Sequence, residues 1–167
     1  MRKVVVVEHN REWQNLFAEE SQSIAKALEN IVAIHHVGST AIPGIYAKPI
    51  IDLLVEVNDI NEVDRNNSNM EDLGYQVMGE YGIVSRRFFR KDNASGIRTH
   101  HVHVFETNSQ QVKRHLAFRD YMIAHPVEAK QYSDLKQKLA KQFPQDIESY
   151  MDGKDEFIKN IDRQAAR

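Results

Sequence analysis

The residue types that could do chemistry are concentrated in one segment, which runs from position 36 to position 52. A β-branched stretch ends there at Gly38, whose missing side chain lets the backbone approach a ligand closely. Ser39 and Thr40 follow at a turn, where backbone N–H groups and a helix dipole can hold phosphate oxygens. Lys48 adds a positive charge, and the carboxylate of Asp52 can hold a divalent cation that bridges phosphates. The spacing predicts a phosphate site.

The same segment has a simpler interpretation, in which Ser39 only caps a short helix at a tight turn. A Gly-Ser pair alone favours that interpretation. Gly-Ser, a lysine and an aspartate within fifteen residues, between two strongly apolar stretches, favour phosphate binding instead. We therefore include His36, Gly38, Ser39, Thr40 and Lys48 among the predicted ligand-binding residues.

A second group of chemically capable residues lies on a predicted strand over 99–106. His101 and His103 share one face of that strand and the valines share the other. Their Cα atoms are ~6.6 Å apart on strand geometry, so two imidazoles can converge on one cation. If the strand neighbours Asp52, two histidines and one carboxylate form a set that suits iron, zinc or manganese better than magnesium. The alternative is a polar cleft in which the histidines hydrogen-bond to carboxylates without a metal.

Positions 86–90 hold only basic and aromatic residues, in the order Arg-Arg-Phe-Phe-Arg. Arginine forks suit phosphate or carboxylate, and phenylalanine rings can stack on a base. The alternative is a half-exposed strand whose aromatic rings belong to the core, which is favoured for Phe88 and Phe89. Arg87 and Arg90 are kept as predicted phosphate contacts.

The secondary-structure elements that must position these residues are predicted from the hydropathy pattern and from the glycine, serine and proline residues that begin or end them. Near-continuous apolar residues over 50–57 are typical of a central strand covered on both faces. Gly74 ends a weakly helical stretch, Ser109 begins a long helix, and Pro126 terminates it. Strands are expected over 31–37, 50–57, 75–78, 83–91 and 99–106, with an extended stretch over 4–7; helices are expected over 10–28, 109–124, 127–142 and 145–161. The predicted class is α+β, a mixed sheet flanked by helices with a helical C-terminal third.

Bulk composition narrows the class of protein. A chain of 167 residues fits one domain over 1–167. The net charge of −2 makes nucleic acid an unlikely partner, and no apolar run is long enough for a membrane span. The chain has no cysteine, which fits a reducing compartment and excludes thiolate chemistry. We expect a cytoplasmic protein with a small ligand, and the sequence leaves its oligomeric state open.

The stretch from His36 to Pro49, followed by Ile50–Val57, resembles the signature of the GrpB family, which is assigned to the nucleotidyltransferase superfamily. The resemblance covers nearly the whole chain and implies a nucleotidyltransferase-like fold. It also makes Arg119 and Lys136 candidates for lining the cleft. Further matching positions are Trp13, Phe17, His101–Val104, Phe118–Tyr121, His125, Pro126, Tyr132, Leu135, Lys136, Leu139, Ala140, Tyr150, Lys154, Phe157 and Ile158.

The chain departs from the superfamily pattern at one position. Nucleotidyltransferases of this fold carry two carboxylates two residues apart on a strand, which together with a third hold two metal ions. Asp52 fits the first, but the second is Leu54, which has no ligand atom. Glu56 is ~13 Å from Asp52 along a strand, too far to share an ion. Two-metal nucleotidyl transfer is therefore doubtful.

Three functions remain open from the sequence. The first is a phosphate- or nucleotide-binding protein that transfers a nucleotidyl or phosphoryl group with Mg, Mn or another divalent metal, with Asp52, His101 and His103 as catalytic and metal residues. The second is a non-catalytic binding module, since Leu54 suggests a decayed site and GrpB-like domains also occur fused to a coenzyme A biosynthesis kinase. The third is a mononuclear zinc or iron enzyme built on the same three residues.

Overall fold

The computed structural model describes residues 3–166, and a single mixed sheet of five strands organises them. The strand order is β1-β2-β5-β4-β3, so β2 and β5 lie at the centre. The central pair is parallel, and every other neighbouring pair is antiparallel. The strands are β1 (Ile31–Val37), β2 (Ile51–Val57), β3 (Tyr75–Val77), β4 (Arg87–Asp92) and β5 (Arg98–Glu106).

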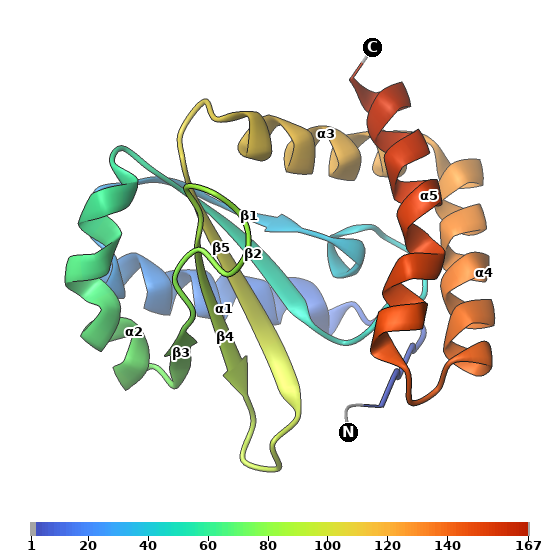
Figure 1. The fold of residues 1–167 in the computed structure, drawn as a ribbon, viewed down its shortest axis with the longest axis horizontal. Coiled ribbons are helices and arrows are strands. Elements are labelled where there is room, and N and C mark those ends of the chain that lie inside the picture. Colours follow the sequence, from blue (N-terminus) through green and yellow to red (C-terminus); the bar gives the residue numbers. More distant parts are fainter. Residues whose placement is uncertain (1–2, 167) are drawn as a thin grey trace.

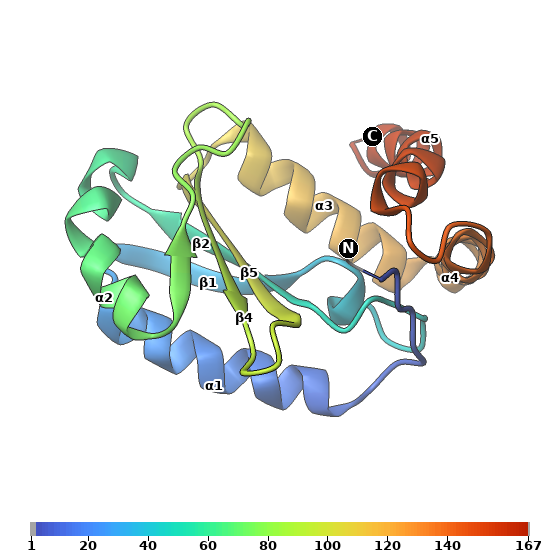
Figure 2. The same cartoon turned by 60° about the horizontal axis from the view of Figure 1, so that its bottom comes forward.

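Helices cover both faces of this sheet, and two further helices lie beyond one end of it. Figure 2 shows α1 along one face and α3 along the other. Figure 1 shows α4 and α5 side by side beyond the sheet, at the end where α3 finishes. The helices are α1 (Glu12–Ala27), α2 (Asn67–Asp72), α3 (Gln110–Ala124), α4 (Pro126–Gln142) and α5 (Ile147–Ala165), with 3₁₀ segments η1 (Ser39–Ala41) and η2 (Ile60–Asn66). This is the predicted α+β arrangement with a helical C-terminal third.

Alternation along β2 separates two cores. Leu53 and Val55 point toward α1 and are fully buried with the valines of β5. Leu54 points the other way, is 0% exposed, and packs with Phe105 and Val112 under α3. The position that would carry a second carboxylate in a two-metal enzyme is thus filled by a core side chain.

Most of the predicted elements are confirmed, with shifts at their ends. The strand predicted over 83–91 begins only at Arg87, because Gly82 and Ser85 adopt positive φ and form a turn before it. Residues 4–7 form an extended lead-in, of which Val7 pairs with Ala47. No helix within residues 3–166 is long and apolar enough to cross a membrane.

Candidate functional site

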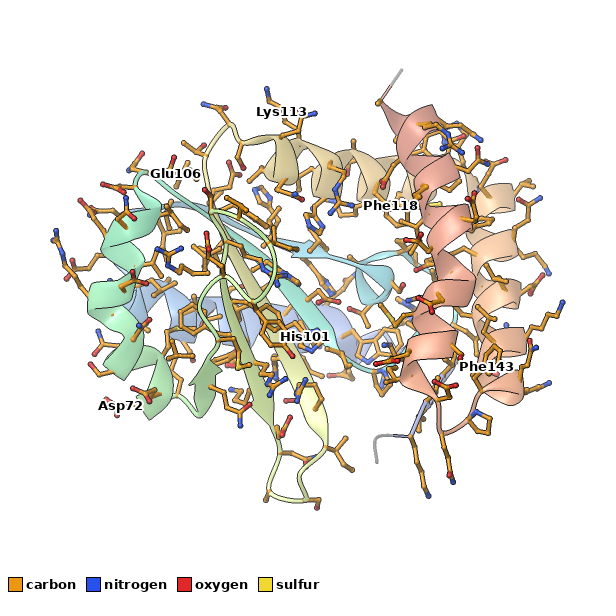
Figure 3. The ribbon with its side chains drawn as sticks, viewed as in Figure 1. Asp72, His101, Glu106, Lys113, Phe118 and Phe143 are labelled. Carbon is orange, nitrogen blue, oxygen red and sulfur yellow. The ribbon has the colours of Figure 1, made fainter. Side chains whose placement is uncertain are left out.

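A cavity of about 320 Å³ lies where β2 and β5 begin, between the α3 side of the sheet and the C-terminal helices. The turn η1 and the loop that follows it close one side. Helices α3, α4 and α5 close the other, and Figure 3 labels His101 and Phe118, which line the cavity from β5 and α3. One wall of the cavity carries an aspartate with two histidines, and the other carries lysines and tyrosines.

The parallel register of the central strands assembles the acidic wall. Asp52 lies directly opposite His101, and His103 is two residues further along the same face. Nε2 of His103 is 3.1 Å from Oδ1 of Asp52, and Nδ1 of His101 is 3.4 Å from the same oxygen. The structure therefore brings together the three residues predicted to be catalytic, and both imidazoles approach one carboxylate oxygen.

The second oxygen of Asp52 lies beside a glycine. Gly38 has φ +74°, and a Cβ at this position would sit 2.7 Å from Oδ2. Burial alone would raise the pKa of Asp52, but the hydrogen bonds from His101 and His103, together with their electrostatic attraction, outweigh burial and hold the pKa well below its usual range. The carboxylate is thus ionised at neutral pH, with Oδ1 used by the imidazoles and Oδ2 at the glycine.

The basic wall is built from lysines on three elements. Lys136 of α4 is 1% exposed, and Nζ has no hydrogen-bond partner among the described residues. Lys154 of α5 is 7% exposed, and Lys48 reaches the same cavity from the loop after η1. Burial, with the charges of Lys154 and Lys48, lowers the pKa of Lys136 to about 6. Burial lowers the pKa of Lys154 to about 8, although Asp52 partly opposes the effect.

Tyrosine rings position these ammonium groups. Nζ of Lys136 lies 4.5 Å from the ring centre of Tyr132, and Nζ of Lys154 lies 4.9 Å from that of Tyr150. Lys48 approaches Tyr150 from 5.2 Å. Burial raises the pKa of Tyr132 to about 12 and also raises the pKa of Tyr150. Both phenols therefore stay neutral and supply no negative charge to this wall of the cavity.

Helix α3 adds a histidine that the sequence analysis did not single out. The ring of His115 lies 5.7 Å from that of His103, centre to centre. Burial, followed by the charges of His103 and Arg114, lowers the pKa of His115 to about 3. His115 is therefore neutral at physiological pH and covers the acidic wall as a polar but uncharged ring.

Several predicted ligand contacts lie away from the cavity. His36 stacks on Phe17 at the α1 side of the sheet, and its Nε2 is 2.9 Å from Oγ1 of Thr40. Burial lowers the pKa of His36 to about 4. Arg119 donates to the backbone carbonyl of His36 and pairs with Asp120. These two residues hold the turn rather than line the cavity, whereas Gly38, Ser39, Thr40, Lys48 and Lys136 do line it.

The two arginines predicted from β4 also lie outside the cavity lining. Arg87 pairs with Asp64 on the α1 side of the sheet. Arg90 donates to Gln76 and stacks over Tyr81. Both guanidinium groups are engaged by neighbouring side chains, as half-exposed strand residues often are.

Asp52, His101 and His103, the three residues predicted to bind a metal, lie close together but face one another. Among residues 3–166, no group of three or more His, Asp or Glu side chains is arranged to hold a metal ion. The imidazoles of His101 and His103 both point at Oδ1 of Asp52, and their rings are 6.4 Å apart at an interplanar angle of 84°. The arrangement does not fit a shared cation, and metal binding by these three residues stays a prediction.

Three of the missed residues, Tyr132, Tyr150 and Lys154, had a readable signal in the sequence. Tyr132 and Lys136 on α4, and Tyr150 and Lys154 on α5, are each four residues apart. Residues at that spacing share one helix face, so a repeated Tyr-x-x-x-Lys pattern places a phenol and an amine side by side. Three of the four counted only toward the family resemblance. The helix pairing that brings both faces to one cavity could not be derived from the pattern.

Fold and site together define a class: a small α+β protein whose mixed sheet and helical C-terminal third enclose a bipolar cavity. The chain belongs to the GrpB family, because the family model described as GrpB protein matches residues 3–164. A crystal structure of the conserved protein GrpB from Enterococcus faecalis superposes with a TM-score of 0.92 at 44% identity, over 96% of both chains.

Proteins of different lengths are similar to this chain over nearly all of it. The UPF0157 protein YqkA of Bacillus subtilis (strain 168) is 46% identical over 99% of this chain, which spans about half (48%) of that protein. The glutamate-rich protein GrpB of Alkalihalophilus pseudofirmus is 36% identical over 95% of this chain and 94% of its own length. The common unit thus occurs both alone and within a longer chain.

Proposed function

We propose that this chain binds a small phosphate-containing molecule of the nucleotide or coenzyme class, with the phosphate at the basic wall of the cavity. The observation that carries the proposal is Lys136, whose amine is buried without a hydrogen-bond partner among the described residues. A buried polar group without a partner costs about 1–3 kcal/mol. A fold that keeps such a group inside a cavity is prepared for a ligand that supplies the missing acceptors.

The surroundings of Lys136 favour an anion over a neutral ligand. Lys154 and Lys48 bring two more amines to the same cavity, and neither Tyr132 nor Tyr150 offers a counter-charge. Charge-assisted hydrogen bonds are roughly twice as strong as neutral ones, and phosphate presents several acceptor oxygens to several donors at once. The volume of about 320 Å³ lies at the lower end of the range for small-molecule pockets.

Nucleotidyl transfer with two metal ions is not part of this proposal. Leu54 lies in the core at the position of the second carboxylate. The proposed activity is therefore ligand binding, and Asp52 contributes a negative hydrogen-bond acceptor at the opposite wall.

Isothermal titration calorimetry tests the proposal with ATP, GTP, CTP, coenzyme A, pyrophosphate and inorganic phosphate, each with and without magnesium. We expect at least one of these to bind, and Lys136→Met to weaken that binding by roughly 10- to 100-fold, because a charged hydrogen bond contributes about 1.5–3 kcal/mol. Lys138→Met is the matched control, since Lys138 is exposed on the same helix. Absence of binding to all six, or equal affinity of the Lys136 variant and its control, contradicts the proposal.

A further inference from the structure

Two arginines, Arg86 and Arg98, lie outside the cavity lining but contact the two histidines of the acidic wall. NH1 of Arg86 is 3.3 Å from Nδ1 of His103, and NH1 of Arg98 is 3.4 Å from Nε2 of His101. Each arginine thus approaches the ring nitrogen that faces away from Asp52. The order of contacts on one side is Arg86, His103, Asp52, and on the other side Arg98, His101, Asp52.

The arginines on one side and the ionised carboxylate of Asp52 on the other together decide which ring nitrogen carries the proton. A guanidinium group has five N–H donors and no acceptor, so the nitrogen that faces it must accept a hydrogen bond. In a neutral imidazole the other nitrogen then carries the hydrogen. His103 therefore carries its hydrogen on Nε2 and His101 on Nδ1, and these two nitrogens lie 3.1 and 3.4 Å from Oδ1 of Asp52.

Both arginines are held in place by further contacts. Arg86 is 6% exposed, donates to the carbonyl oxygens of Glu80 and Tyr81, and lies 4.5 Å above the ring of Phe88. Arg98 has an 11% exposed side chain and pairs with Asp92. The guanidinium groups therefore keep their orientation, and neither imidazole is free to rotate its acceptor nitrogen toward the cavity.

A metal ligand needs the opposite tautomers. A histidine binds a metal through an unprotonated nitrogen, and its other N–H then needs an acceptor such as a carboxylate or carbonyl. At His101 and His103 the far nitrogen meets an arginine donor instead, and the near nitrogen carries a hydrogen toward Asp52.

We propose that Arg86 and Arg98 fix His103 and His101 as donors to Asp52, which makes the acidic wall a metal-free acceptor for a hydroxyl or ammonium group of the ligand. Oδ1 of Asp52 receives both imidazoles, and Oδ2, beside Gly38 in the same cavity, is the atom that serves the ligand. The inference rests on the proposed function for the anionic end of that ligand. It narrows the ligand class to phosphate compounds that also carry a hydroxyl or an ammonium group.

Nitrogen-15 NMR of the imidazole side chains tests the tautomers without any ligand. We expect the hydrogen on Nε2 of His103 and on Nδ1 of His101 at neutral pH. Arg86→Met should shift the Nδ1 signal of His103, which loses its hydrogen-bond donor, while Nε2 keeps its hydrogen toward Asp52. Arg86→Lys should restore the native signal, and Arg87→Met should change neither ring because Arg87 faces Asp64. The opposite tautomer in the wild-type protein overturns the inference, as does an unchanged His103 in folded Arg86→Met.

Metal titration gives a second readout on the wild-type protein. Zn²⁺ and Mn²⁺ should produce no stoichiometric binding and no selective change in the signals of His101 and His103. One equivalent of either ion bound at these rings overturns the inference and supports the metal site predicted from the sequence.

A matched pair of ligands tests the chemical class. AMP should bind to the wild-type protein at least fivefold more tightly than 2′,3′-dideoxy-AMP. Asp52→Asn should reduce that ratio of affinities. The same variant should bind inorganic phosphate at least as tightly as the wild-type protein does. Equal binding of the two nucleotides overturns the hydroxyl assignment. If neither nucleotide nor phosphate binds, the proposed function fails, whereas the tautomers and the metal titration still decide the role of the arginines.

Discussion

At the scale of single residues, Lys136 should lower the stability of the folded protein although it favours ligand binding. An amine buried without a partner lowers the stability of the folded state, so its replacement by methionine, of similar length, should raise the free energy of unfolding by about 1–3 kcal/mol at neutral pH. Residues kept for binding often show this opposition between stability and function. Urea denaturation of Lys136→Met, with exposed Lys138→Met as control, measures the effect; a destabilised Lys136 variant would contradict it.

The advantage of the methionine variant should depend on pH. The pKa of Lys136 is about 6 in the folded protein and near 10.5 in the unfolded chain, so the unfolded state binds more protons between these values. Stability of the wild type therefore rises with pH in that window, by at most about 1.4 kcal/mol per unit. Denaturation at pH 6.5, 7.5 and 9 should show the gap between the two proteins closing. A gap that is constant with pH would mean that Lys136 keeps its proton in the folded state.

Gly38 allows a prediction with a control inside the same loop region. Gly38→Ala places a methyl group 2.7 Å from Oδ2 of Asp52 and adds backbone strain at φ +74°. Gly44 has φ +78° but no atom within 4 Å of its Cβ position, so Gly44→Ala adds the strain alone. A backbone outlier of this kind costs about 1–3 kcal/mol. Thermal unfolding should show a larger loss for Gly38→Ala, and equal losses would contradict the close approach.

At the scale of elements, the packing of α5 on α4 sets the spacing of Lys154 and Lys136. Gly153 is a point of close approach between the two helices, because a Cβ there would lie 2.5 Å from Cδ2 of Leu139. Alanine normally stabilises a helix interior by about 1 kcal/mol relative to glycine. Here Gly153→Ala should instead destabilise the protein and weaken phosphate binding. The double variant with Leu139→Ala should recover binding, and a Gly153 variant that is more stable than wild type would exclude the contact.

The predictability of the fold also differs between elements. Strands with continuous apolar residues, such as β2, and helices with clear ends, such as α3 with its Ser109 cap, were predicted closely because local signals decide them. The predicted start of β4 was wrong because the turn before it has a positive φ at Ser85, and a serine does not by itself indicate that conformation.

The site was predictable on the strands and not on the helices. Asp52, His101 and His103 share a face by the simple alternation of strands, and the neighbouring of β2 and β5 confirms their proximity. Arg87, Arg90 and Arg119 do not line the cavity, because each guanidinium group binds a neighbouring side chain outside it. Arg86 and Arg98 act through histidines, and contacts of that kind depend on packing that no sequence spacing encodes.

At the scale of the whole molecule, the net charge of −2 gives no long-range attraction for an anion, so binding must depend on the cavity itself. An anion beside Lys136 raises its pKa from about 6, and the protein should therefore take up protons on binding near pH 7.5. Below pH 6 the amine already carries its proton and the uptake should vanish. Calorimetry in two buffers of different ionisation enthalpy measures the number of protons, and zero uptake at pH 7.5 would contradict the linkage.

The parallel pairing of β2 with β5 has a consequence for the order of events during folding. Asp52 and His103 are 51 positions apart, and the chain between them, which contains η2, α2, β3 and β4, must close into a loop for the two central strands to align. Contacts of such long separation form slowly because the closure of the connecting chain must precede them. Ligand competence should therefore emerge last during refolding, after the local helices have already gained their ellipticity.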